Sequence, residues 1–292
     1  MVAALVITSV LFVAEVAGGI VSHSLALLSD AGHMLSDLAA QGLSLAALVL
    51  AARPSDRRRT YGYYRIEILA ALANGVALFV LSGWILWSAW LRLRAGPQPI
   101  ETTLMMAVAA AGLVANLVGA WLLHGAQSLN VRGAYLHVLQ DTLSSLAVLV
   151  GGAVMALLAA RVSGIYLIDP ILSIAIGLFV NVGAWRLVRD AVDVLLEAVP
   201  TDIDLDHVSA ALRAQPRVRE VHDLHLWTIT SGIYALSAHL VSDGNVAERD
   251  SLVAGVKAML SQDFRIHHTT IQVESPGHSD PCFGCEERPR TA

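Results

Sequence analysis

Six apolar stretches dominate the first two thirds of the chain, at residues 2–21, 29–51, 66–91, 102–123, 134–160 and 170–194. A helix of roughly 20 residues spans the hydrocarbon core of a lipid bilayer, and each stretch reaches that length. Because no water satisfies backbone groups inside a bilayer, each stretch is predicted to be a helix. The chain is therefore predicted to be a polytopic α-helical membrane protein with six transmembrane helices.

The composition excludes most other classes of protein. Hydrophobic residues make up 55% of the chain and charged residues 15%, whereas soluble domains carry about 25% charged residues. The only cysteines are Cys282 and Cys285, so a fold held together by several disulfides is excluded. Residues 200–292 contain thirteen acidic and eight basic side chains, which accounts for the whole net charge of −5. This acidic segment favours cations as partners and disfavours nucleic acid.

The arginines predict how the helices are oriented in the membrane. Most of them lie after the second and fourth stretches or near the end of the sixth, and these are Arg53, Arg57, Arg58, Arg59, Arg65, Arg132, Arg186 and Arg189. The opposite side holds only Arg92, Arg94 and Arg161. By the positive-inside rule, both termini are predicted to be cytoplasmic. The Ala-, Arg- and Leu-rich composition with a single lysine is typical of GC-rich bacteria, so the predicted location is a bacterial plasma membrane.

After residue 199 the continuous apolar runs give way to mixed segments. Two helical and three β-rich segments follow, and in chain order they lie at 202–213, 218–230, 232–242, 246–260 and 269–274. The order αββαβ predicts a small α+β domain of metallochaperone-like type, with a hairpin turn at Ser231-Gly232. Three parts are therefore predicted: a transmembrane domain at 1–199, a cytoplasmic domain at 200–275 and a tail at 276–292.

Two of the apolar stretches contain a histidine with an aspartate four residues later. These pairs are His33 with Asp37 in the second stretch and His137 with Asp141 in the fifth. Residues four apart lie on one face of a helix, so two such helices facing each other supply two nitrogens and two oxygens. Such a set matches a tetrahedral site for Zn²⁺ and similar ions, and it suits Ca²⁺ or Mg²⁺ poorly. The alternative is that these are polar residues forming hydrogen bonds between helices.

Four segments carry a family resemblance, and they read LLSDAGHMLSD, RRTYGYYRIEILAAL, SLNVRGAYLHVLQD and VHDLHLWTITSG. They resemble the cation diffusion facilitator family, most closely its zinc-transporting branch. The resemblance covers the whole chain. It implies a homodimeric Zn²⁺/H⁺ antiporter that exports zinc from the cytoplasm by alternating access, through a site formed by His33, Asp37, His137 and Asp141. Protons and zinc compete for the same ligand atoms, which suits such an exchange.

The resemblance also implies regulatory zinc in the C-terminal domain. His222, His239 and Glu274 match the family positions that bind this zinc. The predicted strands support the match, because His222 and His239 lie on the two strands of the hairpin and Glu274 ends the third strand. Zinc is thus expected both as the transported substrate and as a regulatory ligand.

Cys282 and Cys285 form a C-x-x-C pair in the polar tail. Two thiolates are half of a zinc site, and in some family members a related pair binds zinc with ligands from the N-terminal tail of the neighbouring chain. This chain begins almost at the first apolar stretch, without histidines or cysteines before it. The pair is therefore a candidate metal site, and a disulfide is the alternative.

Two further positions depart from the family or stay open. Some relatives bind zinc with histidines in the loop after the second stretch, but this chain has Asp56, Arg59 and Tyr63 there, so no zinc is expected in the loop. The resemblance also implies a charge contact near the dimer interface that involves Arg65 and Glu197. The alternative for Arg65 is a positive-inside residue at the membrane surface.

Three other functions compete with zinc export. The first is transport of another divalent metal, such as cobalt, cadmium or iron, because affinity order alone does not decide selectivity. The second is a membrane metalloenzyme, which the absence of an H-E-x-x-H motif and of an open ligand position disfavours. The third is a membrane-anchored metal sensor, although a sensor needs only the soluble domain. The expected partners are zinc, protons, the lipid bilayer and a second copy of the chain.

Overall fold

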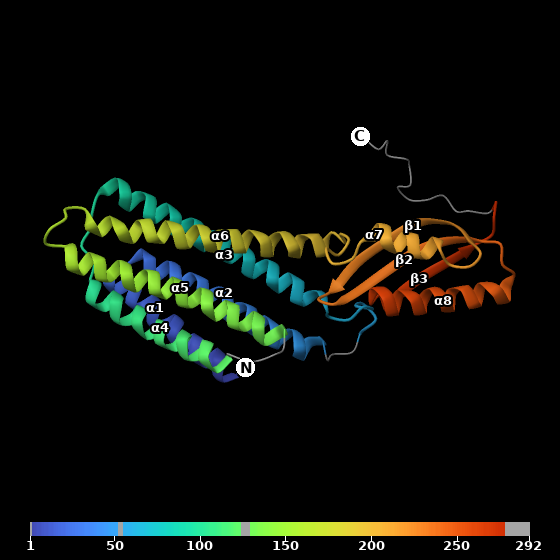
Figure 1. The fold of residues 1–292 in the computed structure, drawn as a ribbon, viewed down its shortest axis with the longest axis horizontal. Helices are drawn as coiled ribbons and strands as arrows, with labels where there is room; N and C mark the ends of the chain where they lie inside the picture. The colour runs from blue at the N-terminus through green and yellow to red at the C-terminus, as the bar shows by residue number, and fades with distance from the viewer. Residues whose placement is uncertain (1, 52–54, 124–128, 278–292) are drawn as a thin grey trace. The chain divides into compact units, whose positions relative to one another are not determined.

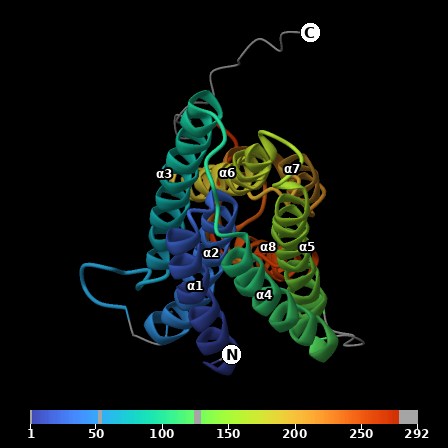
Figure 2. The ribbon, with the colours of Figure 1, turned by 90° about the vertical axis from the view of Figure 1, so that its left-hand side faces the viewer.

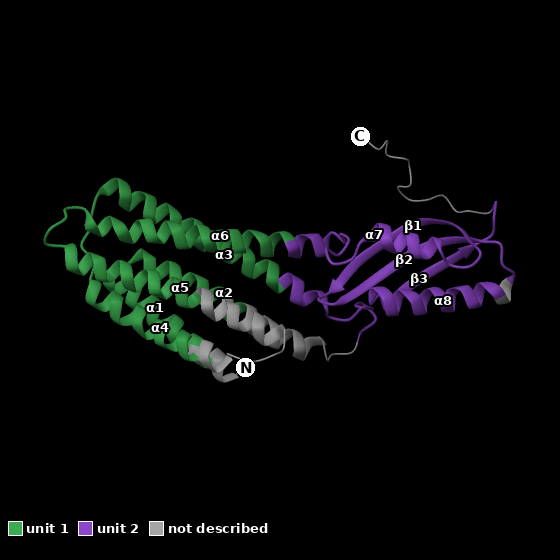
Figure 3. Cartoon of the chain, viewed as in Figure 1, with its two compact units in different colours: residues 1–49, 70–189 green, residues 50–69, 190–292 purple. Residues whose placement is uncertain are grey.

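The computed structural model describes residues 2–51, 55–123 and 129–277. Six long helices come first in the chain: α1 (Val2–Ser22), α2 (Leu25–Ala51), α3 (Arg65–Ala95), α4 (Thr102–Leu123), α5 (Leu129–Leu158) and α6 (Ile168–Leu195). They lie where the six apolar stretches predict helices (Figure 1). Contacts divide the chain into two compact units, one of residues 1–49 with 70–189 and the other of residues 50–69 with 190–292 (Figure 3).

The apolar character of the first unit matches a membrane environment. Within the described residues, three segments are long and apolar enough to cross a bilayer, namely Arg65–Ala95, Asp141–Leu158 and Ile165–Leu195. Two shorter apolar stretches are Thr8–Ser22 and Thr102–Val118. Many large apolar side chains on these helices are exposed, among them Trp84, Trp87 and Trp185. An apolar outer surface of this kind is stable in lipid and not in water.

The helices of the first unit pack closely, and small residues allow the closest approaches. Helices α4 and α5 run side by side, and α1 packs against α4 (Figures 1 and 2). The core lies around Leu27, Met105, Val148 and Met155, which are buried. At Gly151 a Cβ atom would lie 2.4 Å from the Cδ1 atom of Leu172 on α6, so a larger residue there would require the Leu172 side chain to shift. Close helix contacts at small residues are typical of membrane bundles.

The second unit contains a three-stranded sheet with two helices. Its elements are α7 (Leu205–Arg213), β1 (Val218–Thr230), β2 (Ile233–Ser242), α8 (Val246–Phe264) and β3 (His268–Glu274). The sheet order is β1-β2-β3, with β1 and β2 antiparallel and β2 and β3 parallel. The predicted order αββαβ is correct. A core of apolar residues from the strands and both helices includes Val208, Leu236 and Leu260.

The two helices of this unit differ slightly from their predicted bounds. Helix α7 begins at Leu205 and not at 202, because the side chain of Asp204 accepts hydrogen bonds from the N–H groups of Asp206 and His207. Such a side chain satisfies the free N–H groups of a first turn and fixes the start of a helix. Helix α8 starts at the predicted residue, where Asn245 and Glu248 form a reciprocal capping box, and it runs on to Phe264.

Candidate metal centres

The first candidate centre lies between α2 and α5 of the helical unit. His33 on α2 and Asp141 on α5 contact each other, with 3.1 Å between His33 Nε2 and Asp141 Oδ1. Their side chains are 15% and 16% exposed. Two of the four predicted ligands, far apart in sequence, are thus brought together inside the apolar unit. The side chains of the other two, Asp37 and His137, lie outside the described residues.

A cavity of about 640 Å³ adjoins His33. Its walls come from α2, α3 and α6 and include Ser36, Leu78, Phe179 and Arg186. Because the cavity reaches the side chain of His33, this candidate ligand is accessible to a small hydrated ion, although it lies in an apolar unit.

A second polar cluster lies beside this centre and includes Asp30 and Glu15, two ionisable residues for which the sequence favours packing or water-path roles over metal ligation. Asp30 is 2% exposed, and its carboxylate accepts hydrogen bonds from Ser144 Oγ (2.6 Å) and Ser145 Oγ (3.2 Å) of α5. Glu15 on α1 is 1% exposed. The signal in the sequence was an ionisable residue inside an apolar stretch, which is expensive in a bilayer unless it is paired or functional.

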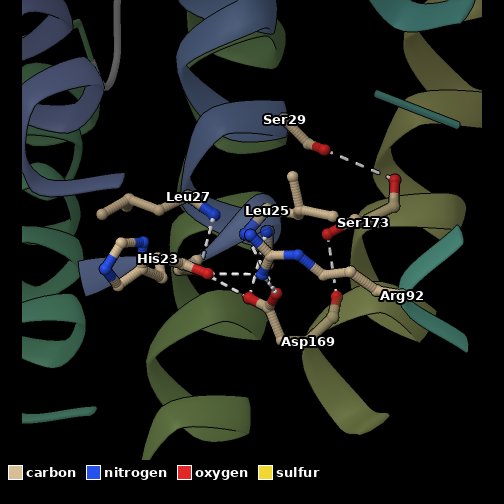
Figure 4. Close-up of polar contacts among 9 residues, drawn as sticks. His23, Leu25, Leu27, Ser29, Arg92, Asp169 and Ser173 are labelled. Atoms are coloured by element: carbon tan, nitrogen blue, oxygen red, sulfur yellow. Dashed lines mark hydrogen bonds and ion pairs between the residues drawn. The ribbon is translucent and has the colours of Figure 1, made fainter. Parts of the chain in front are cut away.

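Asp169 is a further buried carboxylate that the sequence analysis missed. It lies in the first turn of α6, is fully buried, and contacts the start of α2 (Figure 4). The signal was again a charge at the edge of an apolar stretch, but its partners at the start of α2 are 143–145 residues away and local patterns do not reveal them.

The second candidate centre lies on the sheet of the C-terminal unit. His222 Nε2 is 3.1 Å from Glu274 Oε2, and His239 Nδ1 is 2.9 Å from Glu274 Oε1. One ligand atom from each of the three residues lies within 4.8 Å of the other two. The three side chains are 12%, 18% and 5% exposed, in the order His222, His239, Glu274. Two imidazole nitrogens and a carboxylate oxygen form a donor set that suits Zn²⁺.

The strand register explains why these residues meet. His222 on β1 pairs directly with His239 on β2, and Glu274 on β3 pairs with Val241, two residues further along β2. Side chains two residues apart on a strand share a face, so all three lie on one face of the sheet. Asp223 is a fourth residue near the cluster and its second carboxylate, with its Oδ2 atom 3.7 Å from His239 Nε2. The remaining predicted metal ligands, Cys282 and Cys285, lie outside the described residues.

The loop after α2 forms a hydrogen-bonded turn. Asp56 Oδ1 accepts hydrogen bonds from the N–H groups of Arg58 and Arg59, both at 2.7 Å, and Asp56 Oδ2 accepts one from the Tyr63 hydroxyl at 3.0 Å. The Arg59 and Arg58 N–H groups hold the pKa of the Asp56 carboxyl below its usual value. The guanidinium of Arg59 also stacks on the Tyr63 ring, 4.8 Å from its centre. The three residues expected in place of zinc ligands thus bind one another.

The start of α3 is connected to the C-terminal sheet, within the same compact unit. Glu67 in the first turn of α3 accepts hydrogen bonds from Thr230 Oγ1 (2.6 Å) and Ser231 Oγ (2.9 Å) at the β1–β2 turn. Arg65 Nη2 forms an ion pair with Glu197 Oε1 at 2.9 Å inside one chain. The contact that the resemblance places near the dimer interface therefore has an intrachain form. Glu67 was not singled out from the sequence.

Comparisons with known proteins match both units. The family description "Cation efflux transmembrane domain" matches residues 1–196, and "Cation efflux protein, cytoplasmic domain" matches residues 200–276. The chain is 44% identical over 273 residues to the metal cation efflux system protein CzcD of Cupriavidus metallidurans, covering 93% of this chain and 84% of the relative.

Two other relatives are similar over nearly the whole chain. The zinc transporter ZitB of Escherichia coli is 40% identical over 282 residues, covering 94% of this chain and 87% of the relative. A protein of Bacillus subtilis named as a cadmium, cobalt and zinc/H⁺-K⁺ antiporter is 36% identical over 281 residues, covering 94% and 88%. The comparisons confirm the predicted fold class, a helical membrane region followed by a small α+β domain.

Proposed function

The chain belongs to the cation efflux (cation diffusion facilitator) family, of the zinc-transporting type, and from this premise we propose that it is a Zn²⁺/H⁺ antiporter. As a family member it is a multi-pass membrane transporter of divalent metal cations that forms homodimers, and it is not an enzyme. The proposal concerns the metal, the exchanged ion and the residues that carry them.

The observation that carries the proposal is the contact of His33 with Asp141 across α2 and α5. Consecutive membrane helices alternate in direction, so a second and a fifth helix run antiparallel. A step of four residues forward along α2 and a step of four residues back along α5 therefore advance in the same direction and by the same distance. We therefore expect Asp37 opposite His137, one turn from the first pair. The four residues form a closed site of two nitrogens and two oxygens, which suits a bound and released Zn²⁺ ion.

Proton exchange follows from the chemistry of these ligands. Imidazole binds zinc only when it is neutral, and carboxylate only when it is ionised, so protons and zinc compete for the same atoms. Excess protons on one side of the membrane therefore favour zinc release to that side. The name of the Bacillus subtilis relative, which includes H⁺, supports this exchange.

The cavity beside His33 supports entry from the cytoplasm. It extends along α6 from Leu178 to Leu187, toward the C-terminal end of that helix. By the arginine distribution, this end of α6 is cytoplasmic, as are both termini of the chain. We propose that zinc enters through this cavity and leaves on the opposite side. The curated relatives are bacterial, so the membrane is expected to be a bacterial plasma membrane.

For the cytoplasmic domain we propose that His222, His239 and Glu274 bind a regulatory zinc ion. The support is the 4.8 Å cluster of their ligand atoms and their low exposure. Net negative charge on the domain disfavours close approach of two copies, and bound zinc reduces that charge. Zinc binding is then expected to favour the association of the two domains of a dimer.

The test is zinc flux into proteoliposomes under an imposed pH gradient, for the native chain and for Asp141→Ala. Flux that follows the gradient and is lost in Asp141→Ala is the expected result. A matched control is Asp263→Ala, which removes an exposed aspartate on α8 and is expected to leave the flux unchanged. Equal flux in native chain and Asp141→Ala contradicts the proposed site, and flux without any response to the gradient contradicts proton exchange.

A second candidate function is the transport of a broader set of divalent metal ions. The Bacillus subtilis relative is named for cadmium and cobalt as well as zinc. A site of two imidazoles and two carboxylates accepts both ions. Competition of Cd²⁺ and Co²⁺ with zinc flux in the same vesicles distinguishes a zinc-selective transporter from a general one.

A further inference from the structure

A buried carboxylate connects the start of α2 with α6. Asp169 in the first turn of α6 is fully buried, and its side chain accepts three hydrogen bonds from the first residues of α2. The donors are Ser24 Oγ at 2.6 Å, the Leu25 N–H at 2.9 Å and the Ala26 N–H at 3.1 Å (Figure 4). Asp169 therefore caps a helix to which it does not belong.

A third helix joins the same network. Arg92 in the last turn of α3 places Nη1 3.4 Å from Asp169 Oδ2, and it donates a hydrogen bond to the His23 carbonyl before α2 (Figure 4). Ser24 Oγ accepts from the Leu27 N–H at 3.1 Å, so the first three N–H groups of α2 all have partners. A negative charge at a helix N-terminus is favourable, and here it is also paired with a guanidinium.

The contact between α2 and α6 continues for one more turn. Ser29 Oγ donates to the Ser173 carbonyl at 3.4 Å, and Ser173 Oγ donates to the Asp169 carbonyl at 2.8 Å (Figure 4). At Gly32, a Cβ atom would lie 3.5 Å from Leu81 on α3, so α2 and α3 are also close there. The three helices are thus held together from the start of α2 as far as Gly32.

Immediately beyond that point α2 is separated from α6 by a cavity, whereas α3 and α6 stay close. A Cβ atom at Gly75 on α3 would lie 2.8 Å from Val188 Cγ2 on α6, and Asn181 Nδ2 donates a hydrogen bond to Ser82 Oγ at 3.0 Å. The cavity of about 640 Å³ begins at His33 and Ser36 on α2 and is bounded by Leu78 on α3 and by residues 178–187 of α6. His33 therefore lies at the boundary between a tightly connected outer end and an open region.

We propose that Asp169 is a positioning residue that fixes the outer end of α2 as a pivot, about which the opposite end of α2 moves relative to α3 and α6 to open and close the cavity. The inference rests on the proposed function for the direction of transport. Helix α2 rises about 1.5 Å per residue, so His33 lies roughly 12 Å from Leu25 along one continuous helix. A tilt of α2 about the contacts of Asp169, here called the clamp, therefore moves His33 relative to the residues of α6 that line the cavity.

The charge of Asp169 explains why the outer end of α2 is the fixed end. Separating α2 from α6 at Asp169 would leave a buried carboxylate without its donors, and an uncompensated buried charge is costly. Movement of α2 at the cavity end, in contrast, separates no such carboxylate from its donors among the described residues that line the cavity, most of which are apolar. Movement at the cavity end therefore costs less free energy than separation of α2 from α6 at Asp169.

Reversible crosslinking tests the pivot in a chain that keeps Asp169 and has Cys282→Ser and Cys285→Ser as background. The first pair, Ser29→Cys with Ser173→Cys, joins the outer ends, and each variant is compared with itself after reduction. Zinc flux is expected to be the same in the crosslinked and reduced states. Loss of flux on crosslinking this pair would overturn the pivot, because it would mean that the outer ends of α2 and α6 must separate during transport.

The matched pair lies across the cavity, with Ser36→Cys on α2 and Leu187→Cys on α6. Here crosslinking is expected to stop flux, with recovery on reduction. Unchanged flux in the crosslinked state of this pair would also overturn the proposal, because the cavity ends would then not need to move.

A substitution at Asp169 tests its positioning role directly. Asp169→Asn keeps the shape but removes the charge and one acceptor, and it is expected to lower flux roughly 10–100-fold at limiting zinc by raising the KM for zinc. Zinc binding at His222, His239 and Glu274 is expected to stay unchanged, which separates mispositioning from general unfolding. Ser173→Ala, which removes a bond within α6 only, is the matched control. An unchanged KM in Asp169→Asn would refute the positioning role.

Spin labels at the same two pairs of sites separate this inference from the proposed function, because they need no flux. The distance between the labels is measured with and without zinc. A constant outer distance with a changing cavity distance supports the pivot, even if the native chain transports no zinc. A changing outer distance, or no change at the cavity pair, refutes it.

Discussion

Thr230→Val removes the hydroxyl through which the β1–β2 turn holds the start of α3. Thr230 is 5% exposed, and its Oγ1 donates to Glu67 Oε2 at 2.6 Å, the short distance typical of a hydroxyl bound to a carboxylate. Valine keeps the shape and the strand preference, so the loss is confined to the hydrogen bond. A hydrogen bond to a charged group contributes about 1.5–3 kcal/mol, and this one is shielded from water, so we expect a loss of about 2 kcal/mol.

Hydrogen–deuterium exchange of the full chain resolves this loss. A loss of about 2 kcal/mol corresponds to a roughly 30-fold decrease in protection of the amides that open with the contact. We expect this decrease in the first turn of α3 and at the ends of β1 and β2. Ser231→Ala is the comparison, since Ser231 is exposed and its bond to Glu67 is longer, at 2.9 Å, so a smaller decrease is expected.

The effects of Thr230→Val and Glu67→Gln on protection are also expected to be non-additive. With Glu67→Gln as background, Thr230→Val should cost much less than in the native chain, because the charged acceptor is already absent. Protection that changes less than about threefold in Thr230→Val would refute the argument that this bond holds the segment to the sheet.

Two other measurements test the remaining assignments. Glu274→Gln is expected to abolish zinc binding at the cytoplasmic centre, because His222 and His239 then lose their shared anionic partner. Metal analysis after dialysis should show one bound zinc ion fewer per chain. An unchanged ratio of zinc to protein would contradict the proposed centre. Asp56 has a pKa below its usual value in the folded chain, so its charged form stabilises the 56–63 turn above the unfolded pKa, and this contribution is lost as the pH falls through the folded pKa. Asp56→Asn is therefore expected to speed amide exchange at Arg58 and Arg59 at neutral pH, and equal exchange in both chains would argue against the turn.

The elements and the face-sharing of the two His-x-x-x-Asp pairs were predictable from the sequence because they depend on local periodicity, whereas the residues of the cytoplasmic centre came from the family resemblance. The six apolar stretches match α1 to α6, and the strand predicted at 218–230 has exactly the bounds of β1. The spacing of His33 and Asp141 within their motifs placed both on helix faces, and their contact agrees with the predicted pairing of the two helices. The contact between His33 and Asp141 itself depends on tertiary packing and not on the local sequence.

Some helix bounds differed because distant residues cap them. Helix α2 begins at Leu25, four residues before the predicted start, because Asp169 from α6 and Ser24 satisfy its first N–H groups. A local pattern contains no information about a cap supplied from another helix.

The sequence by itself determined that the chain is a helical membrane protein with an α+β domain, because hydropathy and periodicity are local and a bilayer tolerates few alternatives. It also identified which side chains are chemically able to bind zinc. Only the tertiary structure decided that Asp169 clamps α2, that Asp30 pairs with serines of α5, and that Glu67 holds the β1–β2 turn. These contacts join residues 114 or more positions apart for the physical reason that a carboxylate withdrawn from water takes whichever donors packing brings to it, and packing is set by the whole fold.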